Sequence, residues 1–118
     1  MAITRNKYKN VDVSIGDVCN TPYENESMGL ILCVGVSEYI EDLDALLAEI
    51  KRILSHTGFA ILTSSPPGMI NQLRKVQGHK LFLRSQEEMK AKILFGGYKI
   101  LKLNHTMIQN QYLLHKRL

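Results

Sequence analysis

Two short stretches of this 118-residue sequence carry residues that could do chemistry, and each follows a predicted strand. In the first, Asp17 and Val18 come after the stretch Val11–Ile15. An aspartate at a strand end can accept a hydrogen bond from an exocyclic amine, and the Val18 N–H can donate to a ring nitrogen. Together they would bind the edge of an adenine. Asp17 equally fits an ordinary turn residue after Gly16, and the residues alone leave both interpretations open.

The second stretch begins inside the most apolar run, Leu30–Val36, and continues through Cys33–Gly35 to Glu38 and Tyr39. Cys33 is expected to behave as a small buried hydrophobe. The four histidines and two cysteines show no metal-ligand spacing, so we expect no metal site. Glu38, like Glu41, fits a charge at the start of the following helix.

Hydrophobic periodicity predicts the elements that must position these stretches. Val11–Ile15 alternates apolar and polar residues, which predicts a strand. Leu30–Val34 is continuously apolar, which predicts a strand buried on both faces, as in a parallel sheet. Apolar residues recur at helical spacing over Leu43–Leu54, with Asp42 as the predicted N-cap and Gly58 as the predicted helix stop.

The second half of the chain predicts five further elements. In chain order they are a buried strand Phe59–Thr63, a short helix Ile70–Val76, a second helix that begins after Ser85, and two strands, Tyr98–Leu103 and Gln111–His115. Ser85 is the predicted cap of the second helix, and Gly96–Gly97 end it. Its residues Met89, Ile93 and Leu94 are expected to face inward. The strand–helix–strand order indicates a parallel crossover, and the last two strands can form a hairpin. We therefore predict one α/β domain over residues 1–118, with a mostly parallel sheet, a C-terminal antiparallel hairpin and helices on both faces.

The composition restricts the class of protein. An apolar fraction of 45% and a charged fraction of 22% are ordinary for a globular domain. The net charge of +4 comes without a basic-aromatic pattern, so nucleic acid is a remote partner. No apolar run approaches the about 20 residues of a membrane helix, and no signal peptide is recognisable. We expect a soluble, cytoplasmic protein with no membrane partner.

Taken in order, four stretches of the sequence resemble the class I S-adenosylmethionine-dependent methyltransferases. The similarity is to the small-molecule group related to the ubiquinone and menaquinone biosynthesis enzymes. The stretches are Asn10–Val18 with Thr21–Ser27, Leu30–Ile40, Leu46–Leu54 with Thr57–Thr63, and Ser85–Met89 with Gly97–Ile100. The resemblance implies a partial Rossmann-like sheet, S-adenosylmethionine as cofactor, and methyl transfer to a small-molecule acceptor.

The resemblance also implies roles for individual residues. The cofactor-binding residues would be Asp17 and Val18 at the adenine, with Cys33, Val34 and Gly35 lining the methionine and adenosine portion. Glu38 and Tyr39 would face the substrate mouth, and Tyr39 stands where many relatives have His. No catalytic residue is implied, because the cofactor carries the activated methyl group and the protein mainly supplies orientation.

The sequence departs from the family pattern where the family holds its cofactor. None of the eight glycines forms a G-x-G-x-G motif, and the chain begins at what would be the helix before the third strand. Met28–Gly29 also replaces a common aromatic–Asp pair. We therefore expect the C-terminal portion of a methyltransferase domain, truncated, which alone binds the cofactor weakly or not at all.

Loss of the first two strands of the family sheet would leave Leu30–Val34 with an open edge, which proteins usually avoid. Three arrangements are open: Val11–Ile15 lies beside it, a second copy or a partner chain covers it, or the chain is a fragment of a longer protein. The alternative function is accordingly a non-catalytic methyltransferase-like interaction subunit, which docks or dimerises through this edge.

Overall fold

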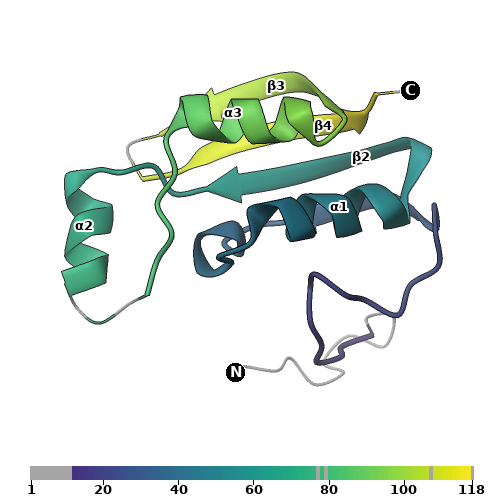
Figure 1. Cartoon of the computed structure of the whole chain (residues 1–118), viewed down its shortest axis with the longest axis horizontal. Helices are drawn as coiled ribbons and strands as arrows, with labels where there is room; N and C mark the ends of the chain where they lie inside the picture. Colours follow the sequence, from purple (N-terminus) through teal and green to yellow (C-terminus); the bar gives the residue numbers. More distant parts are fainter. Residues whose placement is uncertain (1–11, 77, 79, 107, 118) are drawn as a thin grey trace.

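The computed structural model describes residues 12–76, 78, 80–106 and 108–117, which form a four-stranded sheet with helices (Figure 1). The strand order is β1-β2-β4-β3, with β1 parallel to β2 and the other two pairs antiparallel. The elements are β1 (Met28–Cys33), the short 3-10 helix η1 (Ser37–Tyr39), α1 (Leu43–Ile53), β2 (Leu54–Ser64), α2 (Met69–Val76), α3 (Gln86–Phe95), β3 (Tyr98–His105) and β4 (Asn110–Lys116). The predicted α/β fold and C-terminal hairpin are confirmed, while parallel pairing is confined to β1 with β2.

Helix α1 is the amphipathic helix that the periodicity predicts. Its N-cap is Asp42, whose carboxylate accepts the Ala45 N–H at 3.0 Å. The residues of its inner face are at most 6% exposed, namely Leu43, Leu46, Leu47, Ile50 and Ile53. Each fully buried Leu or Ile contributes about 1.5–3 kcal/mol to folding, so this face anchors α1 on the sheet.

The predicted helix stop at Gly58 is wrong. Helix α1 ends at Ile53, and the backbone becomes extended at Leu54, where β2 begins without a loop. Gly58 lies inside β2, where a Cβ atom would be 2.8 Å from the carbonyl oxygen of Gly29 in β1. Glycine at this position serves the close approach of two strands.

Helices α1 and α3 pack on the same face of the sheet (Figure 1). The Tyr98 hydroxyl of β3 lies beneath them and donates to the Leu47 carbonyl of α1. On the opposite face Leu30 and Leu32 of β1 are 59% and 62% exposed. The expectations that helices cover both faces and that Leu30–Val34 is buried on both faces are corrected for the described residues, because both long helices lie on one side.

The predicted strand Val11–Ile15 is wrong for residues 12–15, which form no strand, and Val11 lies outside the described residues. Val13 and Ile15 are 41% and 66% exposed. In the described part of the chain β1 pairs with β2 alone, so the alternating stretch has no neighbouring strand and no face to bury.

Helix α3 follows its predicted signals closely. The Ser85 side chain accepts a backbone N–H of the first turn at 3.1 Å. Met89 and Ile93 are fully buried, whereas Leu94, which was expected to face inward, is 45% exposed. Gly97 follows the helix with φ +92°, a left-handed conformation that favours glycine.

Candidate functional site

The carboxyl ends of the parallel strands β1 and β2 lie at the same edge of the sheet, and residues 33–41 and 63–65 form this carboxyl rim. Gly35 turns the chain away from β1 with φ +71°. Its N–H donates to Thr63 Oγ1 at 2.9 Å, and the Ser37 hydroxyl donates to the Thr63 carbonyl at 2.6 Å. The end of β2 therefore fixes the turn that follows β1.

Cys33 ends β1 as a buried apolar residue, as the sequence predicts. It is 7% exposed, and burial first, then the charge of Glu38 and the neighbouring Cys19, raises the pKa of its thiol to about 11. Cys33 is thus a neutral thiol near pH 7 and not a nucleophile. The next residue, Val34, is 57% exposed at the rim.

Asp17 and Val18 lie in a tight exposed turn. Asp17 Oδ1 accepts the Cys19 N–H at 2.8 Å, and the Asp17 carbonyl accepts the Asn20 N–H at 3.0 Å. Cys19 packs against the hydrophobic core that contains Cys33. Burial first, and then the charge of Asp17, raises the pKa of the Cys19 thiol. Asp17 therefore fixes the turn in which it lies, and its predicted contact with an adenine stays a prediction.

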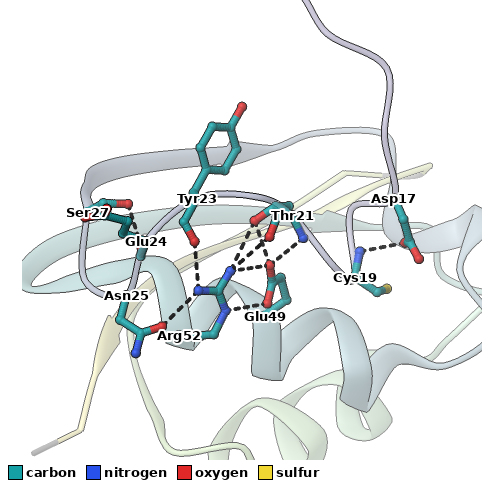
Figure 2. Close-up of polar contacts among 9 residues, drawn as sticks. All are labelled: Asp17, Cys19, Thr21, Tyr23, Glu24, Asn25, Ser27, Glu49 and Arg52. Atoms are coloured by element: carbon teal, nitrogen blue, oxygen red, sulfur yellow. Dashed lines mark hydrogen bonds and ion pairs between the residues drawn. The ribbon is translucent and has the colours of Figure 1, made fainter.

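Beyond this turn, Arg52 of α1 gathers the loop around its guanidinium (Figure 2). It donates to the Glu49 carboxylate at 2.8 and 2.7 Å, to the Tyr23 carbonyl at 2.8 Å and to Asn25 Oδ1 at 2.8 Å. Glu49 Oε2 also accepts the Thr21 N–H at 2.7 Å and its hydroxyl at 2.6 Å. We call Thr21, Tyr23, Asn25, Glu49 and Arg52 the loop clamp.

The two charged residues of the loop clamp, Glu49 and Arg52, stabilise each other's charged form. Hydrogen bonds from Arg52 and then Thr21 lower the pKa of Glu49 to about 2, although its burial acts in the opposite direction. The hydrogen bond to Glu49 raises the pKa of Arg52. The clamp was not predicted from the sequence. The one feature of the sequence that indicates it is the pair of Glu49 and Arg52, which lie three residues apart on one face of α1. It holds the segment that leads from the Asp17 turn to β1.

Glu38, expected as a substrate-side residue or a helix-start charge, is only 4% exposed. Its Oε2 accepts the Ser65 hydroxyl at 2.6 Å, whereas Oε1 is buried and has no hydrogen-bond partner among the described residues. A solvated charge at the start of a helix is therefore the wrong description for Glu38, while Glu41 is exposed and fits it. Tyr39 is 51% exposed, and its hydroxyl lies 3.4 Å from Arg74 Nη2.

Arg84 fixes the turn that carries Glu38, and no pattern in the sequence predicts this role. The guanidinium is 6% exposed and donates to the carbonyl oxygens of Ser37 at 2.8 Å, Ile40 at 2.6 Å and Glu41 at 3.1 Å. Burial lowers the pKa of Arg84, which remains a cation at neutral pH. Its fork geometry suits several carbonyl acceptors at once.

A broad groove of about 920 Å³ lies away from the carboxyl rim and is lined in part by Asn25 and Arg52 of the loop clamp. Its lining comes from one side of α1, the end of α3, the start of β2, the end of β4 and the loop before β1, and includes Lys51, His56, Phe95 and Lys116. None of the predicted site residues lines it. The groove is therefore separate from the carboxyl rim.

A family model described as a methyltransferase domain matches residues 1–62, just over half of the 118 residues. This chain belongs to the class I S-adenosylmethionine-dependent methyltransferase family. Phthiotriol/phenolphthiotriol dimycocerosates methyltransferase 1 of Mycobacterium ulcerans (strain Agy99) is 30% identical over 106 residues, which is 86% of this chain and 37% of that protein. The predicted family is confirmed, and the narrower relation to ubiquinone and menaquinone enzymes stays a prediction.

Solved structures have the same fold. The phosphoethanolamine N-methyltransferase 2 of Haemonchus contortus, in complex with phosphomonomethylethanolamine and S-adenosylhomocysteine, matches 86% of this methyltransferase chain with a TM-score of 0.73 and 13% identity. A Haloferax volcanii methyltransferase in complex with its activator Trm112 matches 87% with a TM-score of 0.73 and 13% identity. The chain spans 36% and 60% of these two chains.

For this methyltransferase-family chain, the structure brings the Asp17 turn and the end of β1 to the same buried cluster through Cys19. Their predicted contacts with a cofactor, like the roles of Glu38 and Tyr39, stay predictions. No described helix is long and apolar enough to cross a membrane. The cytoplasmic location also stays a prediction.

Proposed function

We propose that this chain is the C-terminal part of a methyltransferase domain that moves a methyl group from S-adenosylmethionine to a small-molecule acceptor. The observation that carries the proposal is the packing of the Asp17 turn, through Cys19, against the hydrophobic core to which Cys33 at the end of β1 belongs, with Cys19 close enough to influence the Cys33 thiol. In our proposal, the exposed polar groups of the Asp17 turn and the backbone of residues 33–35 flank one site. That arrangement suits the adenosine half of a cofactor.

The residues fit such a cofactor as follows. Asp17 and Val18 would bind the adenine edge, and the backbone of Cys33, Val34 and Gly35 would line the methionine and adenosine portion. A Cβ atom built on Gly35 meets no atom within 4 Å, so a ligand can approach this backbone closely. The cofactor, when bound, supplies the activated methyl group, and these residues orient it.

The missing glycine-rich motif restricts what this span does by itself. Such a loop holds the far side of a nucleotide with backbone N–H groups. No G-x-G-x-G motif occurs among the eight glycines. We therefore propose that the span alone binds the cofactor weakly and does not turn over.

The named substrates of similar proteins support a small-molecule acceptor. One relative is named for a phthiotriol, and one structural neighbour was solved with phosphomonomethylethanolamine. An alcohol and an amine are both acceptors that lose a proton on methylation. The acceptor of this protein belongs, in our proposal, to the same broad class of small alcohols and amines.

Amide NMR of the chain titrated with S-adenosylhomocysteine tests the cofactor site. We expect shifts confined to residues 17–19 and 33–35, with an affinity in the millimolar range. Asp17→Ala should weaken this binding by about tenfold, while Asp12→Ala, another exposed aspartate, should leave it unchanged. Calorimetry that gives micromolar affinity would contradict the proposed weak binding. Amide shifts at other residues instead of 17–19 and 33–35 would contradict the proposed cofactor site.

A second candidate function is a non-catalytic interaction subunit. Two observations favour it. One edge of β1 is not paired with any described strand, and the residues of β1 carry no charge that would discourage pairing with another chain. The partner would be a second copy of the chain or another methyltransferase. A concentration-dependent dimer or a methyltransferase that co-purifies supports this function, and a stable monomer without a partner contradicts it.

A further inference from the structure

Glu38 is a buried carboxylate with one oxygen that the fold leaves unused. It is 4% exposed, its Oε2 accepts the Ser65 hydroxyl at 2.6 Å, and its Oε1 has no hydrogen-bond partner among the described residues. Within the same residues no Lys, Arg or His forms an ion pair with it. Burying a carboxylate is costly unless both oxygens are paired, so an unpaired oxygen points to a partner that arrives from outside.

The backbone around Glu38 is fixed on both sides, so the carboxylate cannot easily swing into solvent. The Glu38 carbonyl accepts the Phe82 N–H at 2.7 Å. Arg84 holds the carbonyls of Ser37 and Ile40, and the Ser65 hydroxyl holds Oε2. Oε1 is the one remaining acceptor of a side chain whose position is otherwise determined.

Glu38 also lies in the right part of the molecule for a substrate. It belongs to η1, at the carboxyl rim and three residues after Gly35. Val34 and Tyr39, on either side of it in the chain, are 57% and 51% exposed. Glu38 therefore lies in a segment with accessible residues on both sides of it, next to the turn that would line the cofactor.

We propose that Glu38 Oε1 binds the methyl acceptor, by accepting a hydrogen bond from the N–H or O–H of the group that becomes methylated. This inference rests on the proposed function and names the chemistry of its acceptor: an amine or an alcohol, not a sulfide or an unactivated carbon. Glu38 is then a substrate-binding residue, and Ser65 and Arg84 are positioning residues that aim it.

The test is an amide NMR titration of the chain with three small probes. Ethanolamine offers both N–H and O–H donors, ethylene glycol offers O–H alone, and tetramethylammonium is a cation without a donor. We expect ethanolamine to shift the amides of residues 37–40 and of Ser65 saturably, and tetramethylammonium to leave them unchanged. A response to ethylene glycol assigns an alcohol acceptor, and its absence assigns an amine.

Glu38→Gln keeps the shape of the side chain and removes its charge, and it should weaken ethanolamine binding by about tenfold or more. The matched control is Glu41→Gln, an exposed carboxylate three residues away, which should leave binding unchanged. If Glu38→Gln does not fold, Ser65→Ala serves instead. It retains the carboxylate but removes the hydroxyl that positions it, so it should weaken ethanolamine binding while keeping the preference for ethanolamine over tetramethylammonium.

Equal binding of ethanolamine and tetramethylammonium, equal effects of the Glu38 and Glu41 variants, or no response of residues 37–40 to ethanolamine would each overturn the proposal. The titration with S-adenosylhomocysteine is scored separately at residues 17–19 and 33–35. A normal cofactor response without an ethanolamine response rejects the role of Glu38 alone. The reverse result rejects the cofactor site and leaves Glu38 as a site for amines or alcohols.

Discussion

At the scale of single residues, the loop clamp should make stability depend on pH. The pKa of Glu49 falls from 4.5 to about 2 on folding, because Arg52 and Thr21 donate to its carboxylate. A lowered pKa stabilises the folded state above the unfolded pKa, and this contribution is lost as pH falls from about 4.5 towards 2. In urea unfolding series across this interval, Glu49→Gln should show a clearly smaller loss of stability than the wild type.

Asp44→Asn is the matched control for Glu49→Gln, because Asp44 is an exposed carboxylate of the same helix whose ion pair with Lys92 spans 3.2 Å. It should leave the acid dependence nearly unchanged, since exposed pairs contribute little. Equal pH profiles for the wild type and Glu49→Gln would show that the clamp does not form in solution.

Contacts between neighbours in sequence could be predicted, and contacts between distant residues could not. The caps at Asp42 and Ser85 depend on backbone groups within three residues, so residue type and spacing identify them. Glu49 meets Thr21 across 28 residues, and Arg84 meets the Ser37 carbonyl across 47. Those partners become neighbours only when the chain folds, which is why the clamp and the buried arginine were missed.

At the scale of elements, the close approach of β1 and β2 predicts that Gly58 cannot be replaced. A Cβ atom there would lie 2.8 Å from the Gly29 carbonyl and 2.9 Å from Leu54 Cδ1, so the strands must move apart. Gly58→Ala should destabilise the protein by about 1–3 kcal/mol in urea unfolding. Gly29→Ala, on the facing strand, meets no atom within 4 Å and should cost less than about 1 kcal/mol.

Similar losses of stability in Gly58→Ala and Gly29→Ala would contradict the pairing of β1 with β2.

The elements of this fold show what hydrophobic periodicity can and cannot predict. The apolar residues of α1 all lie on one helix, so their spacing in the sequence is sufficient to predict that helix. The alternation of Val11–Ile15 predicts a strand only if a neighbour is present, and within the described chain β1 has β2 as its single partner.

At the scale of the whole molecule, one face of the sheet carries α1 and α3, and the other face is open and apolar over β1 and β2 (Figure 1). Leu30 of β1 pairs with Phe59 of β2 on the open face, where they are 59% and 42% exposed, and Leu32 beside them is 62% exposed. Contiguous exposed apolar surface of this kind marks an interaction site. The edge of β1 adds backbone groups that a second strand can pair.

Sedimentation of the isolated chain should therefore show a concentration-dependent dimer, formed through the β1 edge and the open face. Leu32→Lys places a charge on that surface and should weaken association by at least about tenfold, while folding stability changes by less than about 0.5 kcal/mol because the side chain is exposed. Phe95→Lys introduces the same charge at a residue that is 92% exposed at the end of α3, away from this face, and should leave the dimer intact. A wild-type chain that stays monomeric over the whole concentration range, or equal effects of the two lysines, would show that the open face binds no second copy.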